Sequence, residues 1–319
     1  MQVQTSLARR AVARLERVVG RISRRPARIA VAGVLGVALG SAAVVVGPQL
    51  AGASYNYGQG YLFVGQDGGV FTHGNANYEG SVPSTSDPIA STRKAAGASQ
   101  LPTGKGYWII TTTGGIWDFG TAANHTSIWG EHITLTKPVA GITSDPSGGG
   151  YWVTTGVGGV YSFGNATFYG SLPGSKATPK GTVVGIVANP SGSGYWVFTT
   201  HGWIWDFGNA ASKGSLLSEG ITPAKPISGM AAMPTGNGYW LVGQDGGIFS
   251  FGTAKFHGAL PPTSVPHPVV GIEATTDGGG YWLVTSDGGL LAYGDAQWLG
   301  GQTTTTLAKP IIGFIAPPA

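Results

Sequence analysis

The chain has 319 residues, including 56 glycines, 20 prolines and no cysteine, and its formal net charge is +4. The positive charge comes from residues 1–53, which carry eight arginines against one glutamate, whereas residues 54–319 hold 10 basic and 13 acidic residues and have a net charge of −3. This balance argues against a nucleic-acid-binding surface on residues 54–319, and the lack of cysteine excludes disulfide bonds and thiol nucleophiles.

An uncharged run of 18 residues follows the arginines, from Ile29 to Val46, and Gly47-Pro48 ends it. Its length suits both a long signal-peptide core and a short membrane-spanning helix. Ala51-Gly52-Ala53 fits a signal-peptidase site and favours cleavage. We predict an N-terminal hydrophobic helix, with residues 1–53 acting as an export signal or as a membrane anchor through residues 29–46. Both alternatives place residues 54–319 outside the cytoplasm.

One aromatic stretch is repeated six times after this segment. Each copy opens with a tyrosine, and successive copies begin 46, 44, 44, 44 and 42 residues apart. The tyrosines are Tyr61, Tyr107, Tyr151, Tyr195, Tyr239 and Tyr281. A period in the forties with many aromatic and turn residues is typical of a propeller or another repeat array.

Turn signals divide each unit into four short apolar runs, which we predict to be strands. In the last complete unit the strands are expected at Val269 to Thr275, Tyr281 to Thr285, Leu290 to Tyr293 and Gln297 to Gly300. Asp287-Gly288-Gly289 predicts a tight hairpin turn between the second and third strands.

The second and third strands are apolar at consecutive positions, as in Tyr239-Trp240-Leu241-Val242. Both faces of each small sheet are therefore expected to be buried, as in the blades of a propeller. Each first strand holds a glycine, and this is explained if the first strands approach one another closely. These glycines are Gly97, Gly141, Gly185, Gly229, Gly271 and Gly313.

The two ends of the repeat region complement each other. Ile311 to Ala316 is a first strand with no second strand after it, and the first unit begins at its second strand. We predict an all-β fold, a six-bladed β-propeller of four-stranded blades closed by pairing of the N- and C-terminal strands. A solenoid of aromatic hairpins is the alternative, but the long period and the complementary ends favour the propeller.

The units resemble the repeated Gly-Tyr-Trp-Leu-Val-x-x-Asp-Gly-Gly-Val-Phe-x-Phe-Gly-Asp-Ala units of exported actinobacterial propeller-like proteins. The resemblance covers Gly58 to Ala316, and Phe249-Ser250-Phe251-Gly252 fits it closely. The first unit departs from it, with Leu62 in place of tryptophan and His73 in place of the second aromatic residue. The resemblance implies a surface or secreted repeat domain and supplies no catalytic motif.

Candidate binding residues lie in the hairpin turns. Asp67, Asp245 and Asp287 precede glycine pairs, where aspartate is also expected for turn geometry alone. Other units have threonine, valine or His201 at this position, so the aspartates do not form a symmetric ring. Trp203 replaces the second turn glycine and should project from the rim. We expect these residues to share one face with the variable loops that join the units.

No catalytic residue, metal site or cofactor is predicted. The six histidines lack metal-ligand spacing, and the glycines lack a phosphate-binding motif. Most of the repeated Tyr and Trp side chains are expected to be core residues, because identical strand positions recur in six similar units. Asp118 and Asp206, each in an Ile-Trp-Asp-Phe-Gly stretch, could act as acid and base if they were buried together. Hydrogen bonding to a neighbouring hydroxyl or backbone donor is the better-supported role.

The sequence thus predicts a non-catalytic binding or structural module at the cell surface or in the medium, whose partner is an envelope protein or a glycan and not a nucleic acid. The membrane is a further partner if the N-terminal segment is retained. A lectin-like propeller that binds cell-wall or extracellular glycan is the first alternative. A hydrolase or lyase with a site on the loop face is the second.

Overall fold

The computed structural model describes residues 60–86, 94–175, 178–261, 265–303 and 306–316. The predicted export segment, residues 1–53, lies outside the described residues. The regular structure of the described part consists of β-strands, one 3₁₀ turn, η1 (Val82–Ser84), and one four-residue helix, α2 (Leu172–Ser175). The all-β prediction is confirmed.

The strands form six three-stranded antiparallel sheets, one for each repeat unit. The first strands of the units are β3 (Ala95–Gln100), β6 (Val139–Ser144), β9 (Val183–Ala188), β12 (Ile227–Ala232), β15 (Val269–Ala274) and β18 (Ile311–Ile315). The second strands are β1 (Gly60–Gly65), β4 (Gly106–Thr111), β7 (Gly150–Thr155), β10 (Gly194–Thr199), β13 (Gly238–Gly243) and β16 (Gly280–Thr285). The third strands are β2 (Val70–Gly74), β5 (Ile116–Gly120), β8 (Val160–Gly164), β11 (Ile204–Gly208), β14 (Ile248–Gly252) and β17 (Leu290–Gly294).

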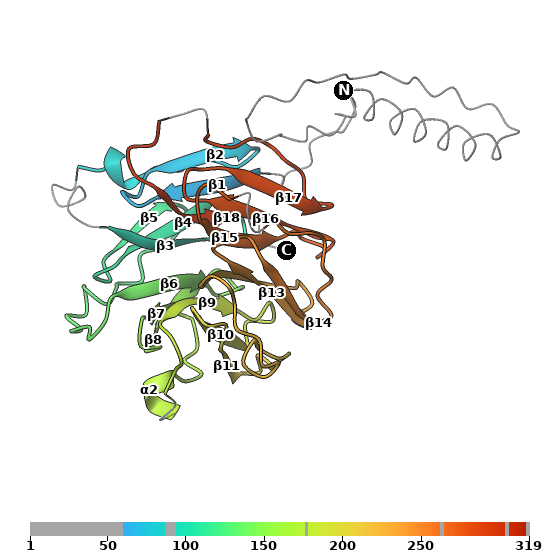
Figure 1. The fold of residues 1–319 in the computed structure, drawn as a ribbon. Helices are drawn as coiled ribbons and strands as arrows, with labels where there is room; N and C mark the ends of the chain where they lie inside the picture. Colours follow the sequence, from blue (N-terminus) through green and yellow to red (C-terminus); the bar gives the residue numbers. More distant parts are fainter. Residues whose placement is uncertain (1–59, 87–93, 176–177, 262–264, 304–305, 317–319) are drawn as a thin grey trace, which may run out of the picture. The chain divides into compact units, whose positions relative to one another are not determined.

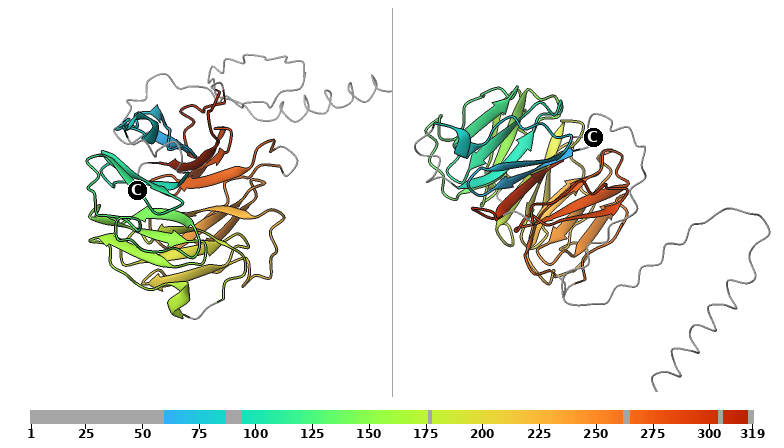
Figure 2. Two further views of the ribbon diagram at one scale, coloured as in Figure 1. Left: turned by 90° about the vertical axis from the view of Figure 1, so that its left-hand side faces the viewer. Right: turned by 90° about the horizontal axis from the view of Figure 1, so that it is seen from above.

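The second strand lies in the middle of every sheet. In five sheets all three strands come from consecutive chain segments, whereas the remaining sheet has the order β18-β1-β2 and joins the two ends of the described chain (Figure 1). Leu62 is paired with Ile315, and Phe63 with Phe314. Figure 2 shows the blue strands β1 and β2 beside the dark red strand β18 from two further directions. The predicted pairing of the N- and C-terminal strands is confirmed.

The predicted fourth strand is wrong, because residues 297–300 and their counterparts are not in strands. Side chains from two sheets form hydrogen bonds with backbone groups of this segment. The indole of Trp282 donates a hydrogen bond to the carbonyl of Gln297 at 2.7 Å, and the hydroxyl of Tyr61 donates to the carbonyl of Gly300 at 2.8 Å. The Tyr61 hydroxyl also accepts a bond from the backbone N–H of Leu299 at 2.7 Å. The segment therefore bridges the sixth sheet and the first.

The same arrangement recurs along the chain. Each repeat tyrosine donates its hydroxyl proton to a backbone carbonyl of another unit, over 2.5–2.8 Å; this is the preceding unit for five of them and the last unit for Tyr61. The acceptors of Tyr61, Tyr107, Tyr151, Tyr195, Tyr239 and Tyr281 are Gly300, Gly80, Thr126, Gly170, Gly214 and Gly258. Each repeat tryptophan donates to the carbonyl 15 residues later in its own unit, over 2.7–3.2 Å. The tyrosine bonds thus link neighbouring units, and the tryptophan bonds tie the segment after each third strand to its own unit.

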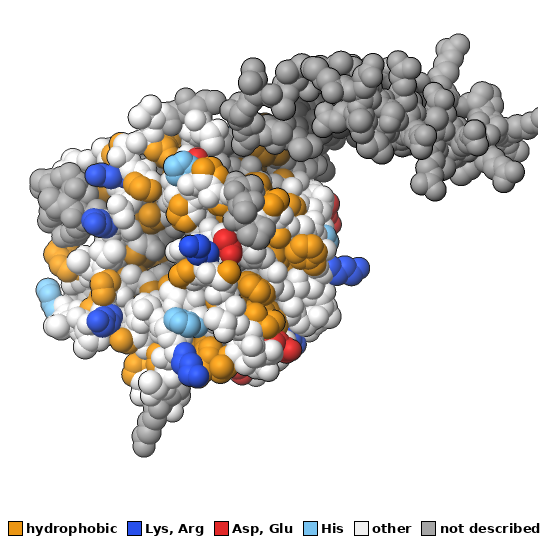
Figure 3. Space-filling model, in the orientation of Figure 1, with side chains coloured by type: hydrophobic (Ala, Val, Ile, Leu, Met, Phe, Trp, Pro, Cys, Tyr) orange, Lys and Arg blue, Asp and Glu red, His pale blue; other side chains and the backbone are white. Residues whose placement is uncertain are grey.

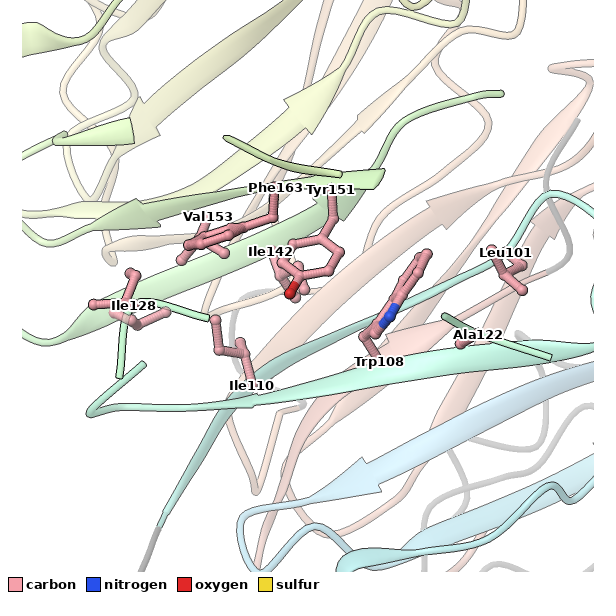
Figure 4. Packing of buried hydrophobic residues seen from close by; sticks show 10 residues of the cluster. Leu101, Trp108, Ile110, Ala122, Ile128, Ile142, Tyr151, Val153 and Phe163 are labelled. Carbon is pink, nitrogen blue, oxygen red and sulfur yellow. The ribbon is translucent and has the colours of Figure 1, made fainter. Parts of the chain in front are cut away.

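The hydrophobic core lies between sheets. Six clusters of buried side chains are present among the described residues, and each joins two neighbouring sheets. In the cluster between the second and third sheets, the rings of Trp108 and Tyr151 lie 5.1 Å apart between centroids (Figure 4). Both side chains are at most 1% exposed. The expectation that most of the repeated aromatic residues are core residues is confirmed at this pair.

The glycine before each repeat tyrosine is required by close backbone packing. A Cβ atom at Gly194 would lie 2.2 Å from the carbonyl oxygen of Phe207 and 2.6 Å from the backbone nitrogen of Ala210. The first-strand glycines differ from one another. A Cβ at Gly141 would lie 3.2 Å from the Cα of Gly185, as expected for closely approaching strands, but a Cβ at Gly313 would have no neighbour within 4 Å.

Candidate functional site

The hairpin turns and the loops that join the units meet on one face, as expected. In five of the six units a backbone N–H after the third strand donates a hydrogen bond to the preceding turn, as Leu172 N does to the carbonyl of Gly158 at 3.0 Å and Leu216 N to the carbonyl of Gly202 at 3.1 Å. The buried side chains of Leu172 and Leu216 lie against these turn glycines. We call this the hairpin face.

The three turn aspartates make local hydrogen bonds on the hairpin face. One carboxylate oxygen of Asp67 accepts the backbone N–H of Gly69 at 3.0 Å, and Asp245 accepts that of Gly247 at 3.1 Å. Asp287 accepts a bond from the Thr285 hydroxyl and lies 3.7 Å from the Nε2 of His267. The hydrogen bonds are those of turn geometry, whereas the contact with His267 joins the turn to the segment before β15, and the three aspartates belong to three different sheets.

His201 and Trp203 lie together in the turn before β11. The Trp203 ring is partly exposed and packs against that of Trp205, with centroids 5.2 Å apart and planes inclined by 53°. The ammonium group of Lys180 lies 5.6 Å from the centroid of the Trp203 ring, within the range of a cation–π interaction. His201 is exposed, and its Nδ1 lies 3.1 Å from the Thr200 hydroxyl. This is a paired aromatic surface with a cation at its side.

Asp118 and Asp206 are exposed and lie in β5 and β11, in the second and fourth sheets. Asp118 accepts a hydrogen bond from the side-chain amide of Asn124 at 3.0 Å. The idea of a carboxylate pair buried together is therefore wrong, because these positions face outward on the third strand. Among the described residues, no group of three His, Asp or Glu side chains has a geometry that could hold a metal ion.

A cavity of about 380 Å³ lies among the first strands of all six sheets. We call it the central cavity. Its walls include the first-strand glycines and, from β10, Phe198, and four prolines from the turns between first and second strands line it as well: Pro102, Pro146, Pro190 and Pro234. These turns lie at the ends of the sheets opposite the hairpin turns. The central cavity and the hairpin face are thus separate features.

Glu273 is the only titratable residue among the described residues that line the central cavity. Its side chain is only partly exposed, and none of the described residues donates a hydrogen bond to the carboxylate or forms an ion pair with it. Loss of water through burial raises the pKa of Glu273 to about 8. A large part of the Glu273 population is therefore protonated near neutral pH.

Sequence reasoning did not single out Glu273, although a signal was present. When the six first strands are aligned on their glycines, the residue two positions later is Ser99, Thr143, Val187, Ala231, Glu273 or Ile315. One of the six is charged. Trp129 was also missed. It is 56% exposed, and its backbone N–H donates to the turn carbonyl of Gly114 at 3.3 Å, which places it on the hairpin face.

Burial also changes the acidity of the repeat tyrosines. It raises the pKa of Tyr107 and of Tyr195 to about 12 and that of Tyr61 and Tyr151 further. These hydroxyls remain protonated donors at any physiological pH. They are part of the scaffold rather than candidates for proton transfer.

The surface outside these features is mixed. Figure 3 shows basic side chains spaced apart on one face, with hydrophobic and uncharged groups between them. No helix in the described part of the chain has the length and apolar character needed to cross a bilayer. Neither a scan against protein-family models nor a search of curated proteins finds a match to this chain.

Proposed function

We propose that residues 54–319 form a closed six-bladed β-propeller with three strands in each blade. Three contacts between the sixth unit and the first support this arrangement. Strand β18 lies against both β15 and β3. Tyr61 bonds to Gly300 as the other repeat tyrosines bond to their preceding units. Trp282 lies 6.1 Å from Tyr61 between ring centroids, in the manner of the other Trp-Tyr pairs.

We further propose that this propeller is an exported binding or structural module at the cell surface and acts without catalysis. The observation that carries this proposal is the use of the repeated polar and aromatic groups within the scaffold, through the Tyr and Trp hydrogen bonds between and within units. Because the repeated groups are engaged within the scaffold, the residues available to bind a partner are those that differ from unit to unit. Variable groups on a rigid scaffold are the usual basis of recognition.

Export is supported by the arginine-rich start and the apolar run of residues 29–46. The test is to express the full chain with a C-terminal epitope and to treat intact cells with protease. We expect the epitope in the medium or accessible to protease on the cell surface. An epitope that is protected in intact cells and degraded only after lysis would refute export, and a cytoplasmic marker protein serves as the control for integrity.

The glycan-binding alternative is favoured by one specific feature, the Trp203-Trp205 surface beside Lys180. Aromatic faces flanked by a polar group suit the apolar face of a sugar ring and its hydroxyls. The test is a glycan array with the full chain and with Trp203→Ala. Trp298→Ala is the matched control, because Trp298 is 52% exposed but lies in the segment after β17 rather than in a hairpin turn.

Selective loss of array binding in Trp203→Ala, with binding retained in Trp298→Ala, would support this alternative. No hits, or equal binding by both variants, would leave a protein partner or a structural role. In that case the same two variants serve in pull-downs from the cell envelope, where the partner should be lost only with Trp203→Ala.

A further inference from the structure

We propose that the central cavity is a binding site for a small organic cation, whose ammonium group pairs with the carboxylate of Glu273 and whose apolar part lies against the cavity wall. The proposal rests on the cavity and on Glu273, and it is independent of the hairpin face and of its partner.

The first observation is that Glu273 takes no part in the contacts made by its equivalents in other units. The hydroxyl of Ser99 accepts the backbone N–H of Ser144 at 2.8 Å, and that of Thr143 accepts the backbone N–H of Ala188 at 3.3 Å. These bonds join successive first strands. Glu273 occupies the same position in β15, yet it receives no such bond from the described residues.

A carboxylate without a partner inside a protein is costly. A carboxyl group whose pKa is shifted by burial and which lines a cavity is therefore a candidate for a ligand-binding role. Because the serine and threonine hydroxyls are engaged with backbone groups, Glu273 is the charged group of the central cavity that remains free to pair with a ligand. The negative carboxylate of Glu273 favours a ligand with a positive charge.

The composition of the wall decides between an inorganic and an organic cation. Calcium and magnesium require about six oxygen ligands, usually with several carboxylates, and one glutamate does not supply them. The wall instead combines hydroxyl and backbone groups with apolar side chains, among them Phe198, Phe314, Met230 and the turn prolines. The aromatic ring of a phenylalanine also stabilises an ammonium group placed over its face, through a cation–π interaction. The volume of about 380 Å³ is within the usual range for small-molecule sites.

The raised pKa of Glu273 makes the proposal specific in its pH dependence. Binding of a cation requires the ionised carboxylate, so binding below the pKa of about 8 must release a proton. No other titratable side chain among the described lining residues faces Glu273. Affinity should therefore fall roughly tenfold for each pH unit below 8 and level off above it.

The experiment is a ligand-observed NMR titration of the full chain with butylammonium, with 1-butanol as the uncharged analogue of similar shape. We expect butylammonium to bind, 1-butanol to bind at least tenfold more weakly, and the affinity for butylammonium to rise from pH 6 to pH 8. Glu273→Gln should remove both the preference and the pH dependence. Asp206→Asn, which removes an exposed carboxylate outside the cavity, is the matched control and should bind as the unmodified chain does.

Equal binding of the two probes, unchanged butylammonium binding in Glu273→Gln, or equal losses in Glu273→Gln and Asp206→Asn would overturn the proposal. Absence of butylammonium binding at pH 8 would overturn it as well. Glu273→Asp keeps the charge on a shorter side chain, so it should retain the pH dependence with weaker binding. This variant separates loss of the carboxylate from loss of the fold, and circular dichroism of each variant checks the latter.

Discussion

Replacing Tyr61 by phenylalanine tests whether the sixth unit is joined to the first as firmly as the internal units are joined to each other. The substitution removes one hydroxyl and leaves the ring in place. That hydroxyl donates to the Gly300 carbonyl at 2.8 Å and accepts from Leu299 N at 2.7 Å. Tyr195 is the matched internal case, since its hydroxyl donates to the Gly170 carbonyl at 2.6 Å and accepts from Tyr169 N at 3.2 Å.

Each variant leaves one backbone donor and one backbone acceptor without their partner. A buried polar group left in this way costs about 1–3 kcal/mol, and water that reaches the site reduces the cost. We therefore expect Tyr61→Phe and Tyr195→Phe each to lower the free energy of unfolding by about 1–3 kcal/mol. Urea denaturation followed by tryptophan fluorescence measures both, and the slope of the transition shows whether unfolding stays cooperative.

The comparison between the two variants carries the test. If the units form a closed ring, the interface between the sixth and first units is one of six similar interfaces and the two losses should agree to within about 1 kcal/mol. A clear loss in Tyr195→Phe with no change in Tyr61→Phe would refute closure. No loss in either variant would show instead that the tyrosine bonds do not hold the units together.

Three further predictions concern single side chains. Gly194→Ala should lower the free energy of unfolding by more than about 2 kcal/mol, because its Cβ would lie 2.2 Å from a backbone oxygen. Gly313→Ala should be neutral or stabilise the chain by up to about 1 kcal/mol, because its Cβ would have no neighbour within 4 Å. Equal melting temperatures of the two variants would contradict the packing argument. Phe314→Ala, at a buried side chain, should lower the free energy of unfolding by about 3–5 kcal/mol. Phe256→Ala, at a side chain 62% exposed, should lower it by less than about 0.5 kcal/mol, and denaturant unfolding measures both. The free energy of unfolding of the unmodified chain, relative to that of Glu273→Gln, should fall as the pH rises. Between the unfolded pKa near 4.5 and the folded pKa of about 8 only the folded state holds the proton, so the fall should be about 1.4 kcal/mol per pH unit. A difference that is constant from pH 5 to pH 8 would show that water solvates this carboxylate fully.

The sequence alone was sufficient for the number of units, the all-β class and the pairing of the chain ends. These features follow from local patterns that recur six times, such as Tyr239-Trp240-Leu241-Val242 in a second strand and the unmatched first strand at Ile311 to Ala316. A repeated pattern averages over the exceptions in single units, so the units could be delimited without knowledge of their packing.

The apolar pattern could not show that the fourth run of each unit does not form a strand. Gln297 to Gly300 has strand-like residues, but its carbonyls bind Trp282 and Tyr61, which lie in different units. The competition between a strand edge and these side chains is decided by how two sheets pack. The same holds for Asp118 and Asp206, whose exposure depends on which side of the third strand meets the neighbouring sheet.

Glu273 shows the same division between sequence and tertiary structure. The sequence contained the one charged residue among six equivalent first-strand positions, but a charge on a strand is usually a solvated surface group. Only the arrangement of six first strands around one space places that carboxylate in a cavity, reduces its hydration and leaves it without a hydrogen-bond partner among the described residues. Local patterning thus determined the units and their order, and the convergence of units distant in the chain determined which side chains line the central cavity.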